Sequence, residues 1–380
     1  MRIAVLGRGN AGCLTALHFE YFKRFVKENI EVSLIFDSKI PTLTVGQATT
    51  LELPKIIWQA LGTDYYSNSK DLDYTLKTGI MYEGWGKVND KIFHPFGLGH
   101  YALHYDTQKF QNHIVNNSNF DVKVVDKYVD DYNKIDADYV FDCRGWPKDF
   151  SNYDELINPL NAVVCSNLPM GKKEVDWTRA VATPDGWAFY IPLHDTVSVG
   201  YMYNSNITSK KTAISNFKKQ FKVDHIRESF PFKQYIAKEP VIDNRVILNG
   251  NMLFFLEPLE STSVATYIQW NRYVYESIIN KTYDLKTASN LIKDYTNKVQ
   301  NFILWHYAAG SKYDTKFWSY AQDLANNNIN DSDLVKVMRY TANKDYAYLR
   351  NTEYDKNGEL YAQWEPYSFK VWYDGVTKKL

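Results

Sequence analysis

The fold is decided by the stretch Arg2-Ile3-Ala4-Val5-Leu6-Gly7-Arg8-Gly9-Asn10-Ala11-Gly12. Its apolar run favours a buried β-strand, and three glycines follow this run at the spacing G-x-G-x-x-G. The next residues place apolar side chains three or four positions apart, which predicts a helix with a stripe formed by Leu14, Leu17, Tyr21 and Phe25. A second apolar run, 31–36, ends at Asp37 and predicts the next strand.

A strand, a glycine turn, a helix and a second strand in this order form a unit that binds dinucleotides. In such a unit Gly7 allows the tight turn, Gly9 lets a pyrophosphate approach the backbone, and Gly12 lets the helix pack closely on the strand. Asp37 is placed to accept hydrogen bonds from a ribose. We therefore predict cofactor contacts at Gly7, Gly9, Asn10, Ala11, Gly12 and Asp37. The alternative is a glycine-rich turn that binds no ligand.

Length, charge and cysteine content limit the class of protein. The 380 residues suffice for two hydrophobic cores or for one large α/β unit with an added layer. Lysine and arginine total 44, as do aspartate and glutamate, and this balance argues against a nucleic-acid partner. The three widely spaced cysteines fit a reduced cytosol without disulfides or a metal site. We expect a cytoplasmic protein, because the sequence begins directly with a strand and has no apolar run of membrane length.

Two segments in the first third of the chain combine polar and aromatic residues unusually. The residues around Lys77 predict a strand in which this lysine shares a face with Gly79 and Met81. Such a lysine is either functional or lies at a sheet edge, where its ammonium reaches water. His94 and Phe96 share a face if their segment is extended, as a clamp on a flat ring requires. A lone buried histidine is more often structural.

A tight loop that leads into a helix is predicted by the sequence Phe254-Phe255-Leu256-Glu257-Pro258-Leu259-Glu260-Ser261-Thr262-Ser263. Helix N-termini expose unpaired N–H groups and carry partial positive charge, so anions collect there. This segment is therefore a candidate anion site. The alternative is an ordinary acidic loop that caps a helix.

Several stretches resemble motifs of the flavin-dependent tryptophan halogenases. They are Val45-Gly46-Gln47-Ala48-Thr49, the strand with Lys77, Gly186-Trp187-Ala188-Phe189-Tyr190-Ile191-Pro192, and the residues FLEPLEST at 255–262. The matches span Gly7 to about Trp364, in the family's order. The chain lacks a long insertion that the family carries after the segment with His94 and Phe96. It also departs from the family at Cys13 (Trp in the family), Gln47 (usually Glu), Phe189 (Trp) and Ser263 (Gly).

The resemblance implies an enzyme that uses FAD as FADH2, oxygen and a halide ion to make hypohalous acid, and that halogenates a small aromatic, indole-like molecule. Lys77 would capture the hypohalous acid, either as a hydrogen-bond donor or, if neutral, as a nucleophile that forms a haloamine. Glu260 would polarise the halogenating species and accept the proton released by the ring. Besides the glycine turn, FAD contacts are implied at Val45, Gly46, Gln47, Ala48, Trp187, Pro258 and Ser261. Substrate contacts are implied at His94, Phe96 and Trp364, and a halide held by the backbone at Thr262 and Ser263.

The predicted fold class is α/β, with an FAD-binding Rossmann-like domain of the glutathione-reductase type, an antiparallel substrate sheet and a C-terminal helical layer. Residues 1–162 and 239–284 are expected to form the FAD-binding core, 163–238 the substrate-side sheet, to which 75–100 contribute, and 285–380 the helical region that closes the substrate site. A flavin reductase that supplies FADH2 is the expected partner. The alternatives are an aromatic hydroxylase on the same fold, and a flavin-binding protein without catalysis. Phe189, Gln47 and the missing insertion keep the hydroxylase open.

Overall fold

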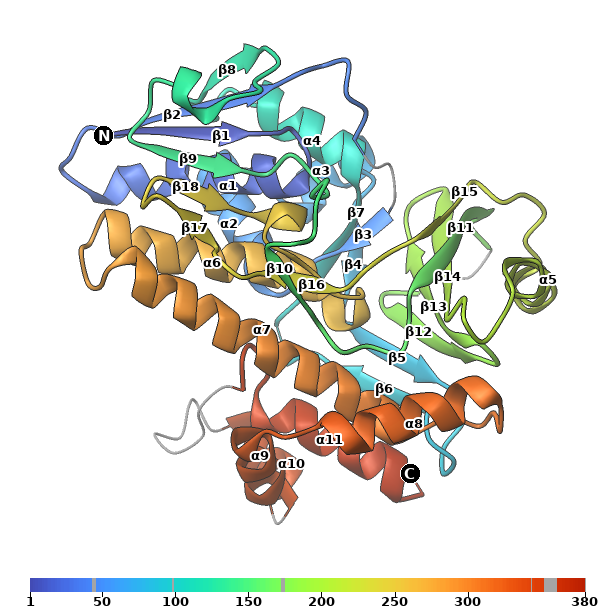
Figure 1. Ribbon diagram of the computed structural model, residues 1–380. Helices are drawn as coiled ribbons and strands as arrows, with labels where there is room; N and C mark the ends of the chain where they lie inside the picture. Colours follow the sequence, from blue (N-terminus) through green and yellow to red (C-terminus); the bar gives the residue numbers. More distant parts are fainter. Residues whose placement is uncertain (43–45, 98, 172–174, 343, 352–360, 380) are drawn as a thin grey trace. The chain divides into compact units, whose positions relative to one another are not determined.

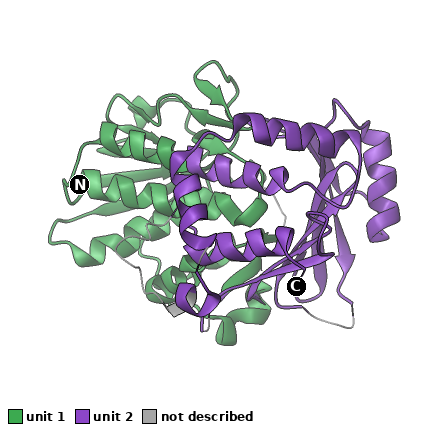
Figure 2. Ribbon diagram, turned by 90° about the horizontal axis from the view of Figure 1, so that it is seen from below, with its two compact units in different colours: residues 1–75, 102–156, 234–296 green, residues 76–101, 157–233, 297–380 purple. Residues whose placement is uncertain are grey.

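The computed structural model describes residues 1–42, 46–97, 99–171, 175–342, 344–351 and 361–379. The chain forms two compact units, each assembled from three segments (Figure 2). Unit 1 consists of Met1–Thr75, Ala102–Leu156 and Gln234–Thr296. Unit 2 consists of Leu76–Tyr101, Ile157–Lys233 and Asn297–Leu380.

Unit 1 is built on a six-stranded sheet with the order β17-β18-β9-β1-β2-β8 (Figure 1). Its strands are β1 (Arg2–Leu6), β2 (Glu31–Phe36), β8 (Lys123–Asp126), β9 (Tyr139–Asp142), β17 (Val241–Ile242) and β18 (Val246–Leu248). Strand β1 runs parallel to both neighbours, with Ile3 beside Val32 of β2 and Tyr139 of β9. Ile3 is 1% exposed, as expected for a central strand of a parallel sheet.

Helices and two small sheets complete unit 1. The helices are α1 (Asn10–Phe22), α2 (Glu52–Leu61), α3 (Tyr65–Leu72), α4 (Thr107–Asn116) and α6 (Thr262–Ile278), with short 3-10 turns η1 (Lys23–Phe25), η2 (Tyr132–Lys134), η3 (Gly250–Met252) and η4 (Leu259–Ser261). One small sheet has the order β3-β7-β4, with β3 (Gly46–Ala48), β7 (Ala102–Asp106) and β4 (Thr75–Lys77), of which Leu76 and Lys77 already belong to unit 2. The other has the order β10-β16-β19, with β10 (Tyr153–Glu155), β16 (Tyr235–Ala237) and β19 (Phe254–Phe255).

The predicted apolar stripe of α1 is correct over its first turns and wrong at its end. Leu14 and Leu17 are 3% and 0% exposed. The α-helix ends at Phe22, and the next three residues form η1, so the helical spacing no longer applies to Phe25, which is 66% exposed.

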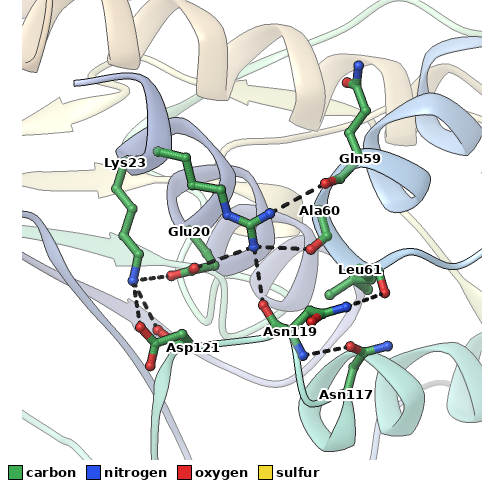
Figure 3. A network of polar contacts seen from close by, with 9 residues as sticks. Glu20, Lys23, Gln59, Ala60, Leu61, Asn117, Asn119 and Asp121 are labelled. Atoms are coloured by element: carbon green, nitrogen blue, oxygen red, sulfur yellow. Dashed lines mark hydrogen bonds and ion pairs between the residues drawn. The ribbon is translucent and has the colours of Figure 1, made fainter.

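A polar network fixes the end of α1 against α2 and the loop before β8 (Figure 3). Arg24 donates hydrogen bonds to the carbonyl oxygens of Ala60 at 3.1 Å and Asn119 at 3.2 Å. Its cation thereby meets the carbonyl-rich C-terminal end of α2, where positive charge is favourable. Glu20, 2% exposed, forms an ion pair with Lys23 at 2.5 Å, and burial raises the pKa of the Glu20 carboxyl.

Unit 2 is built on a seven-stranded sheet with the order β15-β11-β14-β13-β12-β5-β6. Its strands are β5 (Gly79–Glu83), β6 (Lys91–Pro95), β11 (Ala162–Pro169), β12 (Thr178–Thr183), β13 (Gly186–Pro192), β14 (Thr196–Tyr203) and β15 (Glu228–Pro231). Neighbouring strands pair antiparallel, except that β12 pairs parallel with β5. Helix α5 (Lys210–Phe221) covers part of this sheet, with Phe217 packed against Val199 and Tyr201.

The C-terminal part of unit 2 is helical, as the sequence predicted. The helices are α8 (Lys316–Asn328), α9 (Ser332–Ala342), α10 (Tyr346–Asn351) and α11 (Pro366–Thr377), and α7 (Leu285–Ala308) continues into this unit from unit 1. Helix α11 packs on β6, where a Cβ on Gly375 would lie 2.4 Å from the Ile92 side chain. Strands β5 and β6 lie in one sheet with the strands of 163–233, and the three-part domain division remains a prediction.

The predicted single strand through Lys77 and Met81 was wrong. Strand β4 ends at Lys77 and β5 begins at Gly79, because Thr78 bonds to other segments. The Thr78 N–H donates to the Asp176 carbonyl oxygen at 2.6 Å, and its own carbonyl oxygen accepts from the Phe96 N–H at 2.8 Å. The α/β class, the Rossmann-like parallel sheet and the antiparallel sheet are confirmed. Within the described ranges, no helix combines the length and the apolar character that crossing a membrane requires.

Candidate active site

The glycine turn at the start of α1 leaves space above its backbone. Gly7 has a φ of +101°, and a Cβ on Gly12 would lie 1.8 Å from the Gly7 carbonyl oxygen, so both positions need glycine. A Cβ on Gly9, by contrast, would have no described protein atom within 4 Å. Gly9 is the extended N-cap residue of α1, whose first N–H groups have no partner within the helix. The turn therefore fits the pyrophosphate of a dinucleotide.

The strap residue Gln47 in β3 is hydrogen-bonded to the glycine turn through Asn10. Asn10 Nδ2 donates to Gln47 Oε1 at 2.6 Å and to the Tyr105 hydroxyl at 3.0 Å. Gln111 Nε2 in turn donates to Asn10 Oδ1 at 2.9 Å. The Gln47 amide oxygen can accept this bond as a glutamate carboxylate would, so the departure from the family's usual Glu keeps the contact. The sequence did not indicate Tyr105, which comes from the distant strand β7.

The other residues predicted near the glycine turn differ in their exposure to solvent. Asp37 lies after β2 and is partly exposed, and its Oδ1 accepts a hydrogen bond from the Lys39 N–H at 2.9 Å. Cys13 is buried, and burial raises its thiol pKa to about 12, so it is an unreactive thiol at neutral pH. The contact predicted at Val45 lies outside the described residues. Gly46 and Ala48 flank Gln47 in β3.

Two consecutive residues in the loop before α6 have a left-handed backbone. Glu260 has φ 65° and ψ 15°, and Ser261 has φ 59° and ψ 34°. This conformation costs a non-glycine residue about 1–2 kcal/mol. The Ser261 N–H donates to the Pro258 carbonyl oxygen at 3.0 Å, and Thr262 Oγ1 donates to the Glu257 carbonyl oxygen at 3.2 Å. Strain that the surroundings enforce in this way clusters at active sites.

Helix α6 begins directly after this loop, at Thr262. The Thr262 side chain is fully buried, and Ser263 lies one helical turn before Tyr267. Burial raises the pKa of Tyr267 to about 12. The backbone N–H groups at the start of this 17-residue helix lack partners within the helix, which is the chemistry that the predicted halide contact requires. Pro258, a predicted FAD contact, is exposed.

In unit 2, Lys77 is almost fully buried at 1% exposed. Its Nζ lies 5.6 Å from the centroid of the Phe96 ring. His94 is 8% exposed, and burial together with the positive charge of Lys77 lowers the pKa of the imidazole to about 4. His94 is therefore neutral at neutral pH. The structure thus brings together three of the residues predicted from separate segments, whereas Glu260 belongs to unit 1.

Two other aromatic rings lie close to His94. The His94 and Phe96 rings are perpendicular, at 87° with centroids 6.2 Å apart. Tyr367 of α11 presents a ring to His94 at 6.1 Å and 36°. Trp364, the predicted third ring, is stacked on Phe302 at 3.9 Å and 23° and is 5% exposed. The sequence missed Tyr367 as a neighbour of His94.

The motif around Trp187 lies in strand β13 of unit 2. Trp187 is 2% exposed, and its ring lies 6.4 Å from that of Trp85. The neighbouring Phe189 occupies the space over Gly200, where a Cβ would lie 2.2 Å from the phenyl ring. These residues pack the interior of the sheet unit, and the FAD contact predicted at Trp187 remains a prediction.

The parallel sheet with its open glycine turn defines a dinucleotide-binding protein of the Rossmann-like class, here combined with an antiparallel sheet unit. The family model described as tryptophan halogenase matches residues 2–128 and 117–357. The chain therefore belongs to the tryptophan halogenase family and is a flavin-dependent halogenase.

Individual relatives are distant but cover most of the chain. The tryptophan 7-halogenase RebH of Lentzea aerocolonigenes is 20% identical over 85% of this chain and 79% of the relative. The tryptophan 6-halogenase ThaL of Streptomyces albogriseolus is 20% identical over 98% and 87%. Among solved structures, the tryptophan 5-halogenase MibH has a TM-score of 0.81 at 20% identity, covering 99% of this chain and 85% of that one. The flavin-dependent halogenase BrvH of Brevundimonas sp. BAL3 has a TM-score of 0.78 at 18% identity, covering 99% and 89%.

The open space at Gly9 gives a direct test of flavin binding. Gly9 has a φ of −68°, which alanine adopts readily, and an added Cβ meets no described atom, so Gly9→Ala is expected to leave the melting temperature unchanged. The same methyl group would occupy the approach of the pyrophosphate, and we expect FAD affinity to fall about tenfold or more, by about 1.4 kcal/mol. FAD fluorescence titration measures this change. Gly171→Ala, which also meets no described atom, is the matched control. Unchanged FAD affinity in Gly9→Ala would contradict the placement.

Three buried histidines predict acid sensitivity. Burial lowers the pKa of His18 and His306 to about 3 and that of His94 to about 4. Because these values lie below that of an unfolded histidine, the stabilisation is complete above about pH 6.5 and is lost as pH falls toward 4. Each buried histidine is expected to cost about 2 kcal/mol of stability at pH 5. The midpoint of thermal unfolding should therefore fall as the pH is lowered from 7.5 to 5. The dependence of this midpoint on pH should be weaker in His306→Phe and unchanged in His100→Gln, which alters an exposed histidine.

Proposed function

We propose that this enzyme uses FADH2, oxygen and a halide to halogenate a small, electron-rich aromatic molecule of the indole or phenol type. The relatives are tryptophan halogenases that act at different ring positions, which supports this substrate class. The observation that carries the proposal is the buried Lys77 amine, held over Phe96 beside a neutral His94. An amine in this setting is suited to capture an electrophilic halogen and present it to a flat ring.

The chemistry supplied by reduced FAD with oxygen is the oxidation of the halide to hypohalous acid. The residues that would hold FAD are those of the glycine turn, together with Asp37 and the strap around Gln47. The N–H groups at the start of α6, at Thr262 and Ser263, are proposed to hold the halide.

Lys77 is proposed to convert a diffusible oxidant into a fixed one. After the Lys77 ammonium has given up one proton, its nitrogen bonds to the halogen of the hypohalous acid and loses a second proton, while the acid's hydroxyl group leaves as water. The halogen then passes to a ring carbon. Glu260 is proposed to accept the proton that this carbon releases, and the lysine nitrogen regains a proton. His94 and Phe96 are proposed to orient the ring, because orientation decides which carbon reacts.

The test is a reaction of the purified chain with FAD, a flavin reductase, NADH and one halide at a time, against a panel of indoles and phenols. Mass spectrometry distinguishes the outcomes. Products heavier by one halogen atom support the proposal. Products heavier by one oxygen atom would identify a hydroxylase, and the absence of any product from every arene would leave flavin binding as the remaining activity. A flavin reductase is proposed as the partner in the cell, since FADH2 must be supplied.

A further inference from the structure

The ring that faces His94 comes from the C-terminal helix. Tyr367 lies in the first turn of α11, directly after Pro366. Its ring is tilted by only 36° from the His94 imidazole, with centroids 6.1 Å apart. At this distance the two rings are interacting neighbours, since aromatic pairs interact at centroid distances of about 4.5–7 Å. The Phe96 ring, by contrast, stands perpendicular to the imidazole.

Trp364, by contrast, is fixed in the interior of unit 2. Its indole is stacked on Phe302 at 3.9 Å. Its backbone N–H donates to the Tyr361 carbonyl oxygen at 3.0 Å, and its carbonyl oxygen accepts from the Tyr361 N–H at 3.1 Å. Turning the Trp364 side chain toward a ligand would break its stacking on Phe302 and disturb the paired backbone hydrogen bonds with Tyr361. A stabilising role accounts for all of these contacts.

A second layer of residues supports the Tyr367 ring. Tyr346 of α10 packs edge-on against it, at 5.9 Å and 73°. The Tyr346 hydroxyl donates to Asp374 at 2.9 Å, and the Lys370 Nζ lies 5.3 Å from the Tyr346 ring centroid. Lys370 and Asp374 form an ion pair at 3.1 Å, with side chains 7% and 6% exposed.

A buried ion pair is an expensive way to stabilise a helix. Desolvating two charges costs roughly what their attraction returns, and apolar residues of similar size often stabilise as well. What such a pair does provide is a defined position for the groups bonded to it. Here Asp374 accepts a hydrogen bond from the Tyr346 hydroxyl, and the Lys370 ammonium lies over the Tyr346 ring. The Tyr346 ring in turn packs edge-on against Tyr367.

We infer that Tyr367, and not Trp364, forms the substrate slot with His94, and that Tyr346, held by the Lys370–Asp374 pair, is a positioning residue for it. Tyr367 is then a specificity-determining residue, because the plane of the slot fixes which carbon of the arene is presented for halogenation. The role of Tyr367 in halogenation rests on the proposed function. The binding of an arene next to His94 and Tyr367 does not depend on the proposed function.

The first experiment measures binding of indole to the FAD-free chain by calorimetry. We expect Tyr367→Leu to weaken indole binding about tenfold or more, since one face of the ring loses its aromatic partner, and Tyr367→Phe to restore it to within about threefold. Trp364→Phe is expected to lower the melting temperature and leave indole affinity unchanged. The matched control is Tyr373→Leu, an exposed tyrosine on the same helix. Weaker binding in Trp364→Phe with full binding in Tyr367→Leu would overturn the inference.

The second experiment measures the ratio of bromoindole regioisomers. Tyr346→Phe keeps the supporting ring and removes its bond to Asp374, so we expect a changed isomer ratio together with a modest fall in melting temperature. A purely structural tyrosine would lower the melting temperature and leave the ratio unchanged, which would refute the positioning role. If wild type binds indole, Tyr367→Leu does not, and no brominated product forms, the proposed function fails while the slot stands. If wild type brominates indole and both tyrosine variants keep its affinity and isomer ratio, the slot fails while the function stands.

Discussion

Replacing Lys77 with methionine is expected to lower the rate of halogenation by about a thousandfold, equivalent to about 4 kcal/mol of transition-state stabilisation. Methionine has a similar length and is apolar, so it should fill the buried position of Lys77, which is only 1% exposed, without a cavity. The change removes the amine that is proposed to capture the halogen and leaves the residues of the glycine turn untouched. Product formation is measured by mass spectrometry, and retention of FAD by its absorbance.

The Lys77 prediction has two further readouts. Hypohalous acid that is no longer captured should appear in solution, where an added water-soluble phenol would trap it. Lys91→Met, which changes an exposed lysine on β6, should behave like wild type. If Lys77→Met halogenates indole at the parent rate, the proposed role of this lysine is wrong.

The parts of the fold set by local chemistry could be predicted from the sequence. The run Ile3 to Leu6 and the following glycines determine a βαβ unit, because only glycine tolerates the contacts at Gly7 and Gly12. Asp106, a residue type favoured at helix N-caps, accepts a hydrogen bond from the Lys109 N–H at the start of α4. In each case the residues that decide the structure are near neighbours along the chain.

Features that depend on tertiary contacts could not be predicted. The strand through Lys77 breaks at Thr78 because distant segments take its backbone hydrogen bonds. Nothing in the local sequence indicates a left-handed backbone at Glu260, since no glycine is present to favour it. Tyr105 meets Asn10 across 95 residues of chain.

For the aromatic slot, a weak signal was available in the sequence. Tyr367, Lys370 and Asp374 are spaced by three, four and seven positions, which places them on one side of α11. A tyrosine that shares a helix side with a buried ion pair is a candidate for a positioned residue. Motif matching predicts Trp364 as the substrate ring, because it aligns residue types along the chain and uses no spatial information.

Replacing Glu260 with glutamine is expected to lower halogenation about 100-fold, the lower end of the effect of removing a general base. Glutamine keeps the size of the side chain and the backbone preference, so the loop should retain its conformation while the proton acceptor is lost. Oxygen consumption by reduced FAD should continue and should release hypohalous acid or peroxide instead of product. Glu239→Gln, at an exposed position in the same unit, is the matched control.

Glu260→Gly separates this chemistry from the backbone strain. Glycine adopts the observed φ of 65° without the cost that glutamate bears, so the variant should gain about 1 kcal/mol, or about 2–4 °C in melting temperature, while losing at least as much activity as the glutamine variant. Opposite changes in stability and activity at one residue are expected where a strained conformation serves catalysis rather than folding. A glutamine variant with parent-like product rates would exclude Glu260 as the proton acceptor. A glycine variant that is less stable than the parent would show that the left-handed conformation is not a source of strain.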